Sequence, residues 1–97
     1  MRRLVTRPQA EIEVEAAAAW YDEEREGLGD EFLAEVRAAA ARALEAPARY
    51  PQVHRHMRRV LLERFPYLLV FRATSDEVLI LACVHGHRDP RVWRSRR

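Results

Sequence analysis

The segment from Val78 to Val84 constrains the fold of this chain more than any other. All seven residues are apolar, in the order Val-Leu-Ile-Leu-Ala-Cys-Val. In an extended strand, alternate side chains point to opposite sides, so this segment presents an apolar surface on both faces. Strands of this kind are usually central in a sheet and covered twice. We therefore expect a sheet with helices on one face and a second cover on the other.

Two further strands are expected before this segment. Arg59–Arg64 and Phe65–Ala73 are short, rich in Val, Leu and Phe, and bounded by turn signals, and the third strand is expected over Val78–His85. The polar residues Thr74–Asp76 satisfy backbone groups locally and predict a hairpin turn between the last two strands. Together these segments predict a sheet of consecutive antiparallel strands.

Strict alternation assigns the side chains of these strands to two faces. In the second strand, Leu68 and Val70 lie opposite the odd-numbered residues Phe65 to Ala73. In the third strand, the two sets are Val78, Ile80, Ala82 and Val84 against Leu79, Leu81 and Cys83. Because one helical layer covers only one face, we expect the isolated chain to expose apolar surface on the other, which marks an interaction site.

The N-terminal part predicts a short strand, Arg3–Thr6, followed by a helix. Thr6 and Gln9 have the spacing of a capping box, and Pro8 fits the first turn of a helix. The helix is expected to run to about Glu26 with one apolar stripe on its inner face. That stripe consists of Ile12, Ala16, Ala19 and Trp20.

A turn containing two glycines, Gly27–Gly29, leads into a second helix, for which Asp30 is the expected N-terminal cap. Its inner face at helical spacing consists of Phe32, Val36, Ala39, Ala40 and Ala43. Pro47 ends this helix, and Ala48–Met57 is expected to be an irregular connector. The predicted order is β-α-α-β-β-β, an α+β fold in which a helical hairpin packs on an antiparallel sheet.

Length and composition restrict the class of protein. The 97 residues are expected to form a single domain over residues 1–97. No apolar run approaches the roughly 20 residues of a membrane helix, and the N-terminus lacks the apolar core of a secretion signal. The single cysteine, Cys83, lies in an apolar strand and is expected to be a buried thiol. These features favour a cytoplasmic protein.

The net charge of +2 conceals a strong asymmetry along the chain. Residues 11–45 carry eleven acidic residues and three arginines, a net charge of −8, whereas residues 46–97 carry eleven arginines and four acidic residues, a net charge of +7. A basic half of this kind favours an anionic or acidic partner on the sheet side. All seventeen basic residues are arginine, which together with fifteen alanines is typical of a codon bias.

Histidine and arginine gather at the end of the third predicted strand. His85, His87 and Arg88 could supply a base, an acid and a cation for RNA cleavage, or His85 and Arg88 could simply anchor the strand end through hydrogen bonds. His54 and His56 repeat the His-x-His spacing, but no acid or cysteine completes either pair, and no metal is expected. The sequence has no glycine-rich phosphate loop and no cofactor signature, so no cofactor is expected.

Four segments carry a resemblance to a known family. They are GLGDEFLAEV at 27–36, PARYP at 47–51, RRVLLERFPYLLVFR at 58–72 and VLILACVHGHRDPRVWRSR at 78–96. Together they resemble the RelE/ParE superfamily of toxins from type II toxin–antitoxin systems, and within it the ParE-like branch, the plasmid stabilisation toxins. The last two segments are the most specific, and the resemblance covers nearly the whole chain.

The resemblance implies a toxin that binds DNA gyrase, traps it with cleaved DNA and is neutralised by a cognate antitoxin. This activity is binding rather than catalysis, with no membrane and no sequence-specific recognition of nucleic acid. The residues expected to bind the target are Arg88, Arg91, Trp93, Arg94, Arg96 and Arg97. The alternative for Trp93 is that it packs over the sheet or the helical hairpin and holds the C-terminal segment in place. The residues expected to bind the antitoxin are Leu68, Val70, Leu79 and Leu81.

Two other functions stay open. One is a ribosome-dependent mRNA endoribonuclease of the RelE type, for which His85, His87 and Arg88 are the candidate catalytic residues. Several such nucleases have a tyrosine near the C-terminus, where this chain has Trp93. The other is a toxin-like domain that has lost its target and only binds its antitoxin.

Overall fold

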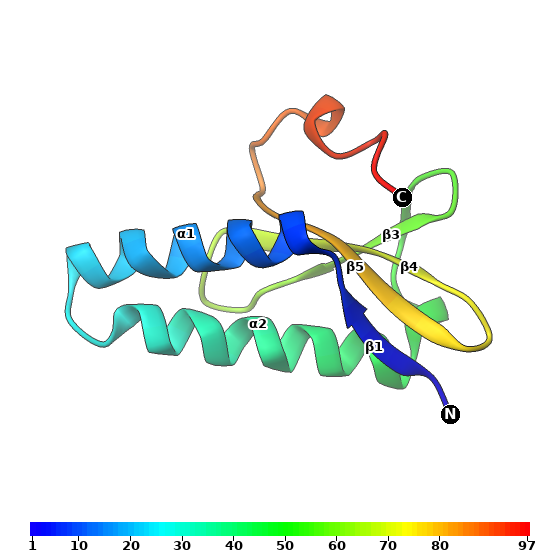
Figure 1. The fold of residues 1–97 in the computed structure, drawn as a ribbon, viewed down its shortest axis with the longest axis horizontal. Helices are drawn as coiled ribbons and strands as arrows, with labels where there is room; N and C mark the ends of the chain where they lie inside the picture. Colours follow the sequence, from blue (N-terminus) through cyan, green and yellow to red (C-terminus); the bar gives the residue numbers. More distant parts are fainter.

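The computed structural model describes residues 1–97 and has three layers. Two helices lie on one face of a five-stranded sheet, and the C-terminal segment crosses the other face (Figure 1). In chain order the elements are β1 (Arg3–Thr6), α1 (Pro8–Glu24), α2 (Leu28–Glu45), β2 (Gln52–His54), β3 (Met57–Leu61), β4 (Tyr67–Ala73) and β5 (Glu77–His85). Short 3₁₀ turns occupy Pro47–Arg49 and Pro90–Val92. The predicted α+β class and the order β-α-α-β-β-β are confirmed.

The sheet has the order β1-β5-β4-β3-β2, so the doubly apolar strand β5 lies inside it, as predicted. β1 pairs with β5 in parallel, with Val5 opposite Leu79, which makes the sheet mixed rather than antiparallel. The prediction of an irregular connector over Ala48–Met57 is wrong in part, because β2 pairs antiparallel with β3 across a tight turn at Arg55. Three residues are too few for a strand to produce a recognisable alternation.

The face assignment is confirmed for β4 and wrong for the second half of β5. Between β4 and β5 the register shifts, so that Val70 lies opposite Ala82 while Phe71 lies opposite Ile80. Leu81 is therefore an extra residue on β5, a β-bulge, and it reverses the alternation beyond it. As a result Cys83 joins the helix-facing cluster, and Ala82 joins the cluster on the opposite face.

The inner face of α1 also differs from the prediction. Ile12 and Trp20 are 64% and 55% exposed, and Ala16 and Ala19 are exposed as well. The residues that pack against the core are Ala10, Val14, Ala17, Ala18 and Tyr21, which follow the same helical spacing in another phase. Alanines on that face let the backbone of α1 approach α2 and β5 closely, whereas the prediction placed the largest side chains inside.

The helical hairpin closes through Asp22 rather than Asp30. α2 begins at Leu28 after Gly27, whose φ of 86° is in the left-handed region that favours glycine. The Asp22 carboxylate on α1 accepts a hydrogen bond from the backbone N–H of Gly29 at 2.7 Å. A Cβ on Gly29 would lie 2.5 Å from the carbonyl oxygen of Ala18, so the close contact of the helices requires glycine there. The capping box at Thr6 is also absent, because Thr6 ends β1 and Arg7 precedes the helix without a side-chain cap.

The buried face of α2 is as predicted, since Phe32, Ala39, Ala40 and Ala43 are buried and Val36 packs against the same core. Near the helical turn, Phe32 and Tyr21 stack with ring centroids 5.3 Å apart, and Phe65 meets both rings edge-on. This aromatic cluster joins the hairpin to the start of β4.

The second face of the sheet is covered by the chain's own C-terminal segment. Trp93 is only 6% exposed and belongs to an apolar cluster with residues of β3, β4 and β5. The four residues expected to bind an antitoxin lie in this cluster and are buried: Leu68, Val70, Leu79 and Leu81. The prediction that the isolated chain exposes this face is therefore wrong, because residues after Pro90 fold back onto it.

Candidate functional site

An ion pair between Glu13 and Arg96 holds the C-terminal segment in place. Nη1 and Nη2 of Arg96 donate to the two carboxylate oxygens of Glu13 on α1 at 2.7 and 2.9 Å, and Nη1 also donates to the carbonyl oxygen of Leu81 at 3.1 Å. Glu13 accepts a third hydrogen bond, from the backbone N–H of Cys83 at 3.0 Å. Arg96 was predicted to bind the target, but its side chain is engaged within the fold. Trp93 packs on the sheet, which is one of the two alternatives predicted for it.

The other predicted target-binding residues are on the surface. Arg91 donates two hydrogen bonds to the Asp89 carboxylate, at 2.7 and 3.0 Å, and hydrogen bonds from the Arg91 side chain and backbone N–H lower the pKa of Asp89. Arg88, Arg94 and Arg97 are exposed, and their guanidinium groups form no ion pair. The positive charge available to a partner therefore comes from Arg88, Arg94 and Arg97 rather than from all six residues.

These arginines meet others from the sheet around two hollows. The smaller, about 180 Å³, is lined by Arg59, His85, Arg88, Trp93 and Arg94 among others. The larger, about 450 Å³, is lined by the β2–β3 turn, Arg72 and Arg94–Arg97. Arg94 borders both hollows, and neither is lined by an aspartate or a glutamate.

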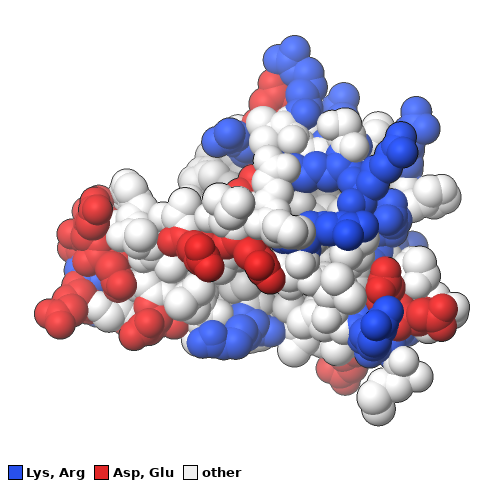
Figure 2. Space-filling view, in the orientation of Figure 1, with Lys and Arg blue, Asp and Glu red and all other residues white.

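We define the arginine surface as Arg55, Arg59, Arg72, Arg88 and Arg94. Arg59 lies opposite Val70, and Arg72 lies opposite Leu79, so both side chains share the face that the C-terminal segment covers. In Figure 2, arginine side chains gather over this part of the molecule at the upper right, whereas most carboxylates lie along the helices at the left and a smaller group lies at the lower right. The acidic and basic parts of the sequence are therefore largely separated in space as well as along the chain.

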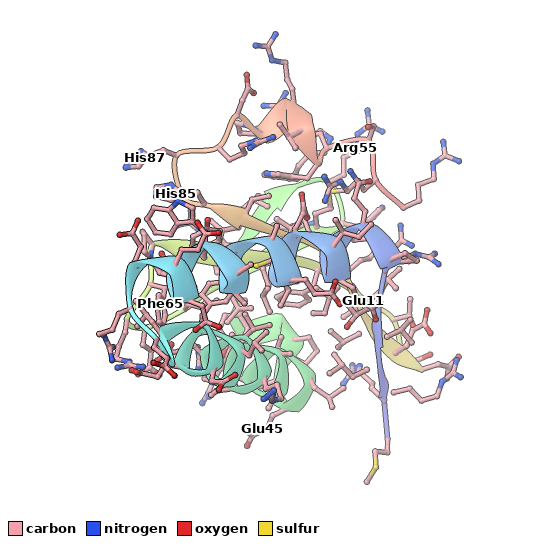
Figure 3. All side chains as sticks on the ribbon, turned by 60° about the vertical axis from the view of Figure 1, so that its left-hand side comes forward. Glu11, Glu45, Arg55, Phe65, His85 and His87 are labelled. Atoms are coloured by element: carbon pink, nitrogen blue, oxygen red, sulfur yellow. The ribbon has the colours of Figure 1, made fainter.

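His85 and His87 lie at the end of β5, across the molecule from Arg55 (Figure 3). Nδ1 of His85 accepts a hydrogen bond from the backbone N–H of His87 at 3.1 Å, as expected for a histidine that anchors a strand end. The two imidazole rings stack with centroids 5.4 Å apart. Because the His87 N–H occupies Nδ1, Nε2 is the nitrogen of His85 that is free to contact a partner.

Tyr67 is a site residue that the sequence did not indicate. It pairs with His85 across the β4–β5 ladder, and the two rings are 5.5 Å apart. Burial raises the pKa of Tyr67, and nearby Cys83 adds to the shift, so its hydroxyl remains a neutral donor. Only the strand register brings Tyr67 beside His85, because 18 positions separate them in the sequence.

No three His, Cys, Asp or Glu side chains come together in a way that could hold a metal ion, at either His-x-His pair or elsewhere. Cys83 is buried as predicted, and burial, with a smaller contribution from Glu13, raises its pKa to about 12. Neither helix has the length and apolar character that a bilayer-spanning helix needs.

Two large exposed apolar side chains, Ile12 and Trp20, occur on α1, and single ones occur on β1 (Leu4) and β3 (Leu61). Trp20 borders a hollow of about 320 Å³ between α1 and the end of β5, together with Ala16, Ala17, Tyr67 and Val84. Ile12 lies on the same helix and is more exposed than Trp20. The largest accessible apolar side chains of the helical layer are therefore on α1.

The chain was compared with known proteins. The sequence matches the family described as ParE toxin of type II toxin-antitoxin system, parDE, over residues 4–90. Among solved structures, a chain of the chromosomal ParDE TA system from P. aeruginosa matches with a TM-score of 0.68 and 22% sequence identity, covering 88% of this chain and 96% of that chain. That structural match shows a shared fold. No curated protein sequence gives a significant match. Because the family match spans most of the chain, this protein belongs to the ParE toxin family of type II toxin–antitoxin systems.

Proposed function

We propose that this protein acts in the cytoplasm as a toxin that binds and inhibits DNA gyrase and is neutralised by a cognate antitoxin. Membership of the ParE toxin family supports the toxin role. The single observation that carries the binding mode is the arginine surface, which borders two hollows lined by no acidic residue. A surface with this charge attracts an anionic partner and speeds association with it.

In this proposal the residues of the C-terminal segment have two different roles. Trp93 and Arg96 fix the segment to the sheet and to α1, through burial and through the Glu13 ion pair. Arg88 and Arg94 make contact with the target, which is gyrase together with the DNA that it holds, since their guanidinium groups have no ion-pair partner within the chain. Binding of this kind requires a fixed arrangement of charges and no proton transfer.

The proposed contact with the antitoxin lies on α1 rather than on the sheet face that the sequence suggested. Leu68, Val70, Leu79 and Leu81 would become accessible only if the C-terminal segment left the sheet. Ile12 and Trp20 are exposed without any rearrangement, and large exposed apolar side chains support a protein contact.

The test is a gyrase supercoiling assay with the double variant Arg88→Gln/Arg94→Gln. We expect it to inhibit gyrase at least tenfold less than the unchanged protein, while circular dichroism and the unfolding midpoint stay the same. Arg37→Gln/Arg49→Gln is the matched control, because both arginines are exposed, outside the two hollows and in no ion pair. Full inhibition by Arg88→Gln/Arg94→Gln would refute this binding mode.

A second candidate function has one observation in its favour. Tyr67, His85 and Arg88 border the same hollow, which places a neutral hydroxyl, an imidazole and a cation together. An endoribonuclease needs groups of these kinds for acid–base catalysis and for charge on the phosphate. Incubation with translating ribosomes distinguishes the functions: a nuclease fragments mRNA and loses roughly 10²–10⁴-fold activity in His85→Gln, whereas a gyrase inhibitor leaves the mRNA intact.

A further inference from the structure

The arginine surface differs from the rest of the molecule because five arginines without ion-pair partners gather there, around two hollows that no acidic residue lines. Six of the other twelve arginines pair with acids, as Arg42 does with Glu63, Arg64 with Glu31 and Glu35, and Arg96 with Glu13. None of the seven ion pairs and none of the side-chain hydrogen bonds involves a guanidinium group of Arg55, Arg59, Arg72, Arg88 or Arg94. Fifteen acidic residues are present in the chain, yet none lines either hollow.

The surface is long and comes from separate elements. Arg55 is in the β2–β3 turn, Arg59 on β3 and Arg72 on β4, while Arg88 and Arg94 belong to the C-terminal segment. The two hollows meet at Arg94, and Figure 3 shows Arg55 at one end of this side of the molecule and His85 at the other. Repeated cations along one side match a ligand whose negative charges also repeat, rather than a single anion.

The chemistry of the larger hollow distinguishes two classes of partner. Interfaces between proteins have an apolar core, often with an aromatic anchor. Here the only apolar lining residue is Met57, which is 6% exposed. The smaller hollow has four apolar lining residues, but its aromatic one, Trp93, packs into the apolar cluster on the sheet and is also only 6% exposed. Interfaces with nucleic acid are more polar and far more positively charged, and about half or more of their hydrogen bonds go to phosphate and sugar. The composition of the hollow fits the second class.

We propose that the arginine surface binds the phosphate backbone of duplex DNA without reading its sequence. The choice of duplex DNA rests on the proposed function, because inhibited gyrase would hold cleaved duplex DNA next to the toxin. In such a complex the protein contacts both components, with arginines on neighbouring phosphates of the DNA. Each phosphate that an arginine neutralises releases counterions, so the affinity falls with salt.

The experiment measures binding of the full chain, without gyrase, to a fluorescently labelled DNA duplex of arbitrary sequence by anisotropy. Between about 50 and 200 mM salt, we expect a linear plot of log affinity against log salt, with a slope of about −0.9 per phosphate contacted, or roughly −4.5 for five contacts. Arg72→Gln and Arg94→Gln should each reduce the magnitude of this slope by about 0.9. Arg37→Gln, which removes the same charge from the exposed side of α2, should leave the slope unchanged.

Equal slopes for Arg72→Gln, Arg94→Gln and Arg37→Gln would overturn the proposal, since the attraction would then depend only on net charge. Tighter binding of a polyglutamate peptide than of the duplex would assign the surface to an acidic protein, and tighter binding of single-stranded RNA would assign it to RNA; either result overturns it. Gyrase inhibition tests the proposed function separately. Gyrase inhibition by an unchanged protein that does not bind the duplex refutes this inference alone, whereas DNA binding without gyrase inhibition refutes only the gyrase function.

Discussion

Glu13 and Arg96 are 83 positions apart in the sequence and form a two-pronged ion pair, with contacts of 2.7 and 2.9 Å. Their side chains are 21% and 10% exposed, so solvent screens the pair less than it screens the others on the surface. The pair connects α1 to a segment that carries part of the arginine surface. The position of Arg94 therefore depends on a carboxylate in the first helix.

The first prediction concerns the stability that this pair contributes. Glu13→Gln should lower the free energy of unfolding by about 1–3 kcal/mol, because it leaves a partly buried guanidinium without its charged acceptor. Arg96→Gln should have a similar effect, and the double variant should lose less than the sum of the two. Urea unfolding measures all three variants. Glu15→Gln on the exposed side of α1 is the control, and additive effects would show that the two residues do not interact in solution.

The second prediction concerns the two tryptophans, which report on opposite environments. Trp93 is 6% exposed and Trp20 is 55% exposed. The Trp20→Phe variant, which keeps Trp93, should fluoresce at shorter wavelength and resist quenching by acrylamide. The Trp93→Phe variant, which keeps Trp20, should show the reverse. Equal quenching of the two variants would mean that the C-terminal segment does not rest on the sheet in solution.

The third prediction concerns truncation after Pro90. This change removes Trp93 and Arg96 together, so it uncovers the apolar cluster that contains Leu68 and Leu79. We expect the truncated protein to bind the dye ANS and to lose its cooperative unfolding transition, or to aggregate. A truncated protein with an unchanged unfolding midpoint and no dye binding would contradict this. Truncation therefore cannot separate target binding from antitoxin binding, and point substitutions of the surface arginines are needed for that.

Much of the fold could be predicted from local patterns. The apolar residues from Val78 to Val84 indicated an internal strand, and the polar residues at Thr74–Asp76 indicated the hairpin, where the Thr74 hydroxyl accepts hydrogen bonds from the N–H groups of Asp76 and Glu77. Both patterns depend only on neighbouring residues. The bulge at Leu81 could not be predicted in this way, because its position is set by the pairing with β4.

The candidate site was only partly predictable, for a related reason. The excess of arginine near the C-terminus was visible in the sequence, but its division into structural and exposed residues was not. Arg96 and Arg94 are two positions apart, yet only Arg96 meets a carboxylate, which comes from α1. Tyr67 likewise reaches His85 only through strand register. Contacts between residues distant in the sequence decide these roles, and no local spacing encodes them.

The fourth prediction concerns pH and Glu35 on α2. Its carboxylate accepts hydrogen bonds from the backbone N–H of Glu63 and from Arg64, which lower the pKa of Glu35 below its ordinary value. A lowered pKa in the folded state contributes stability above the unfolded pKa of about 4.3, and this contribution is lost as the pH falls through the folded value. Glu35→Gln should thus be less stable than the unchanged protein at about pH 7, and the difference should shrink towards about pH 3.

Urea unfolding at both pH values measures this difference. Glu23→Gln is the control, because the Glu23 side chain is exposed on α1 and forms no hydrogen bond or ion pair. A difference between Glu35→Gln and the unchanged protein that stays constant with pH would show that packing, rather than the charge of Glu35, causes it.

The fifth prediction concerns the proposed antitoxin contact on α1. Trp20 is the largest exposed apolar side chain of the helical layer and borders the hollow beside β5. If the antitoxin covers it, Trp20→Ala should weaken the complex by at least tenfold, since a central aromatic anchor typically contributes about 2 kcal/mol or more to binding. Isothermal titration with the purified cognate antitoxin measures the dissociation constant.

Leu61→Ala is the matched control for this measurement. Leu61 is 54% exposed, nearly as much as Trp20, but it lies at the end of β3 and away from α1. Its substitution should leave the affinity for the antitoxin unchanged. The reverse result, with Leu61→Ala weakening the complex and Trp20→Ala leaving it intact, would place the antitoxin at the β3 end of the sheet. Unchanged affinity in both variants, together with quenching of Trp93 by acrylamide in the complex of the Trp20→Phe variant, would return the antitoxin to the sheet face and require the C-terminal segment to leave it.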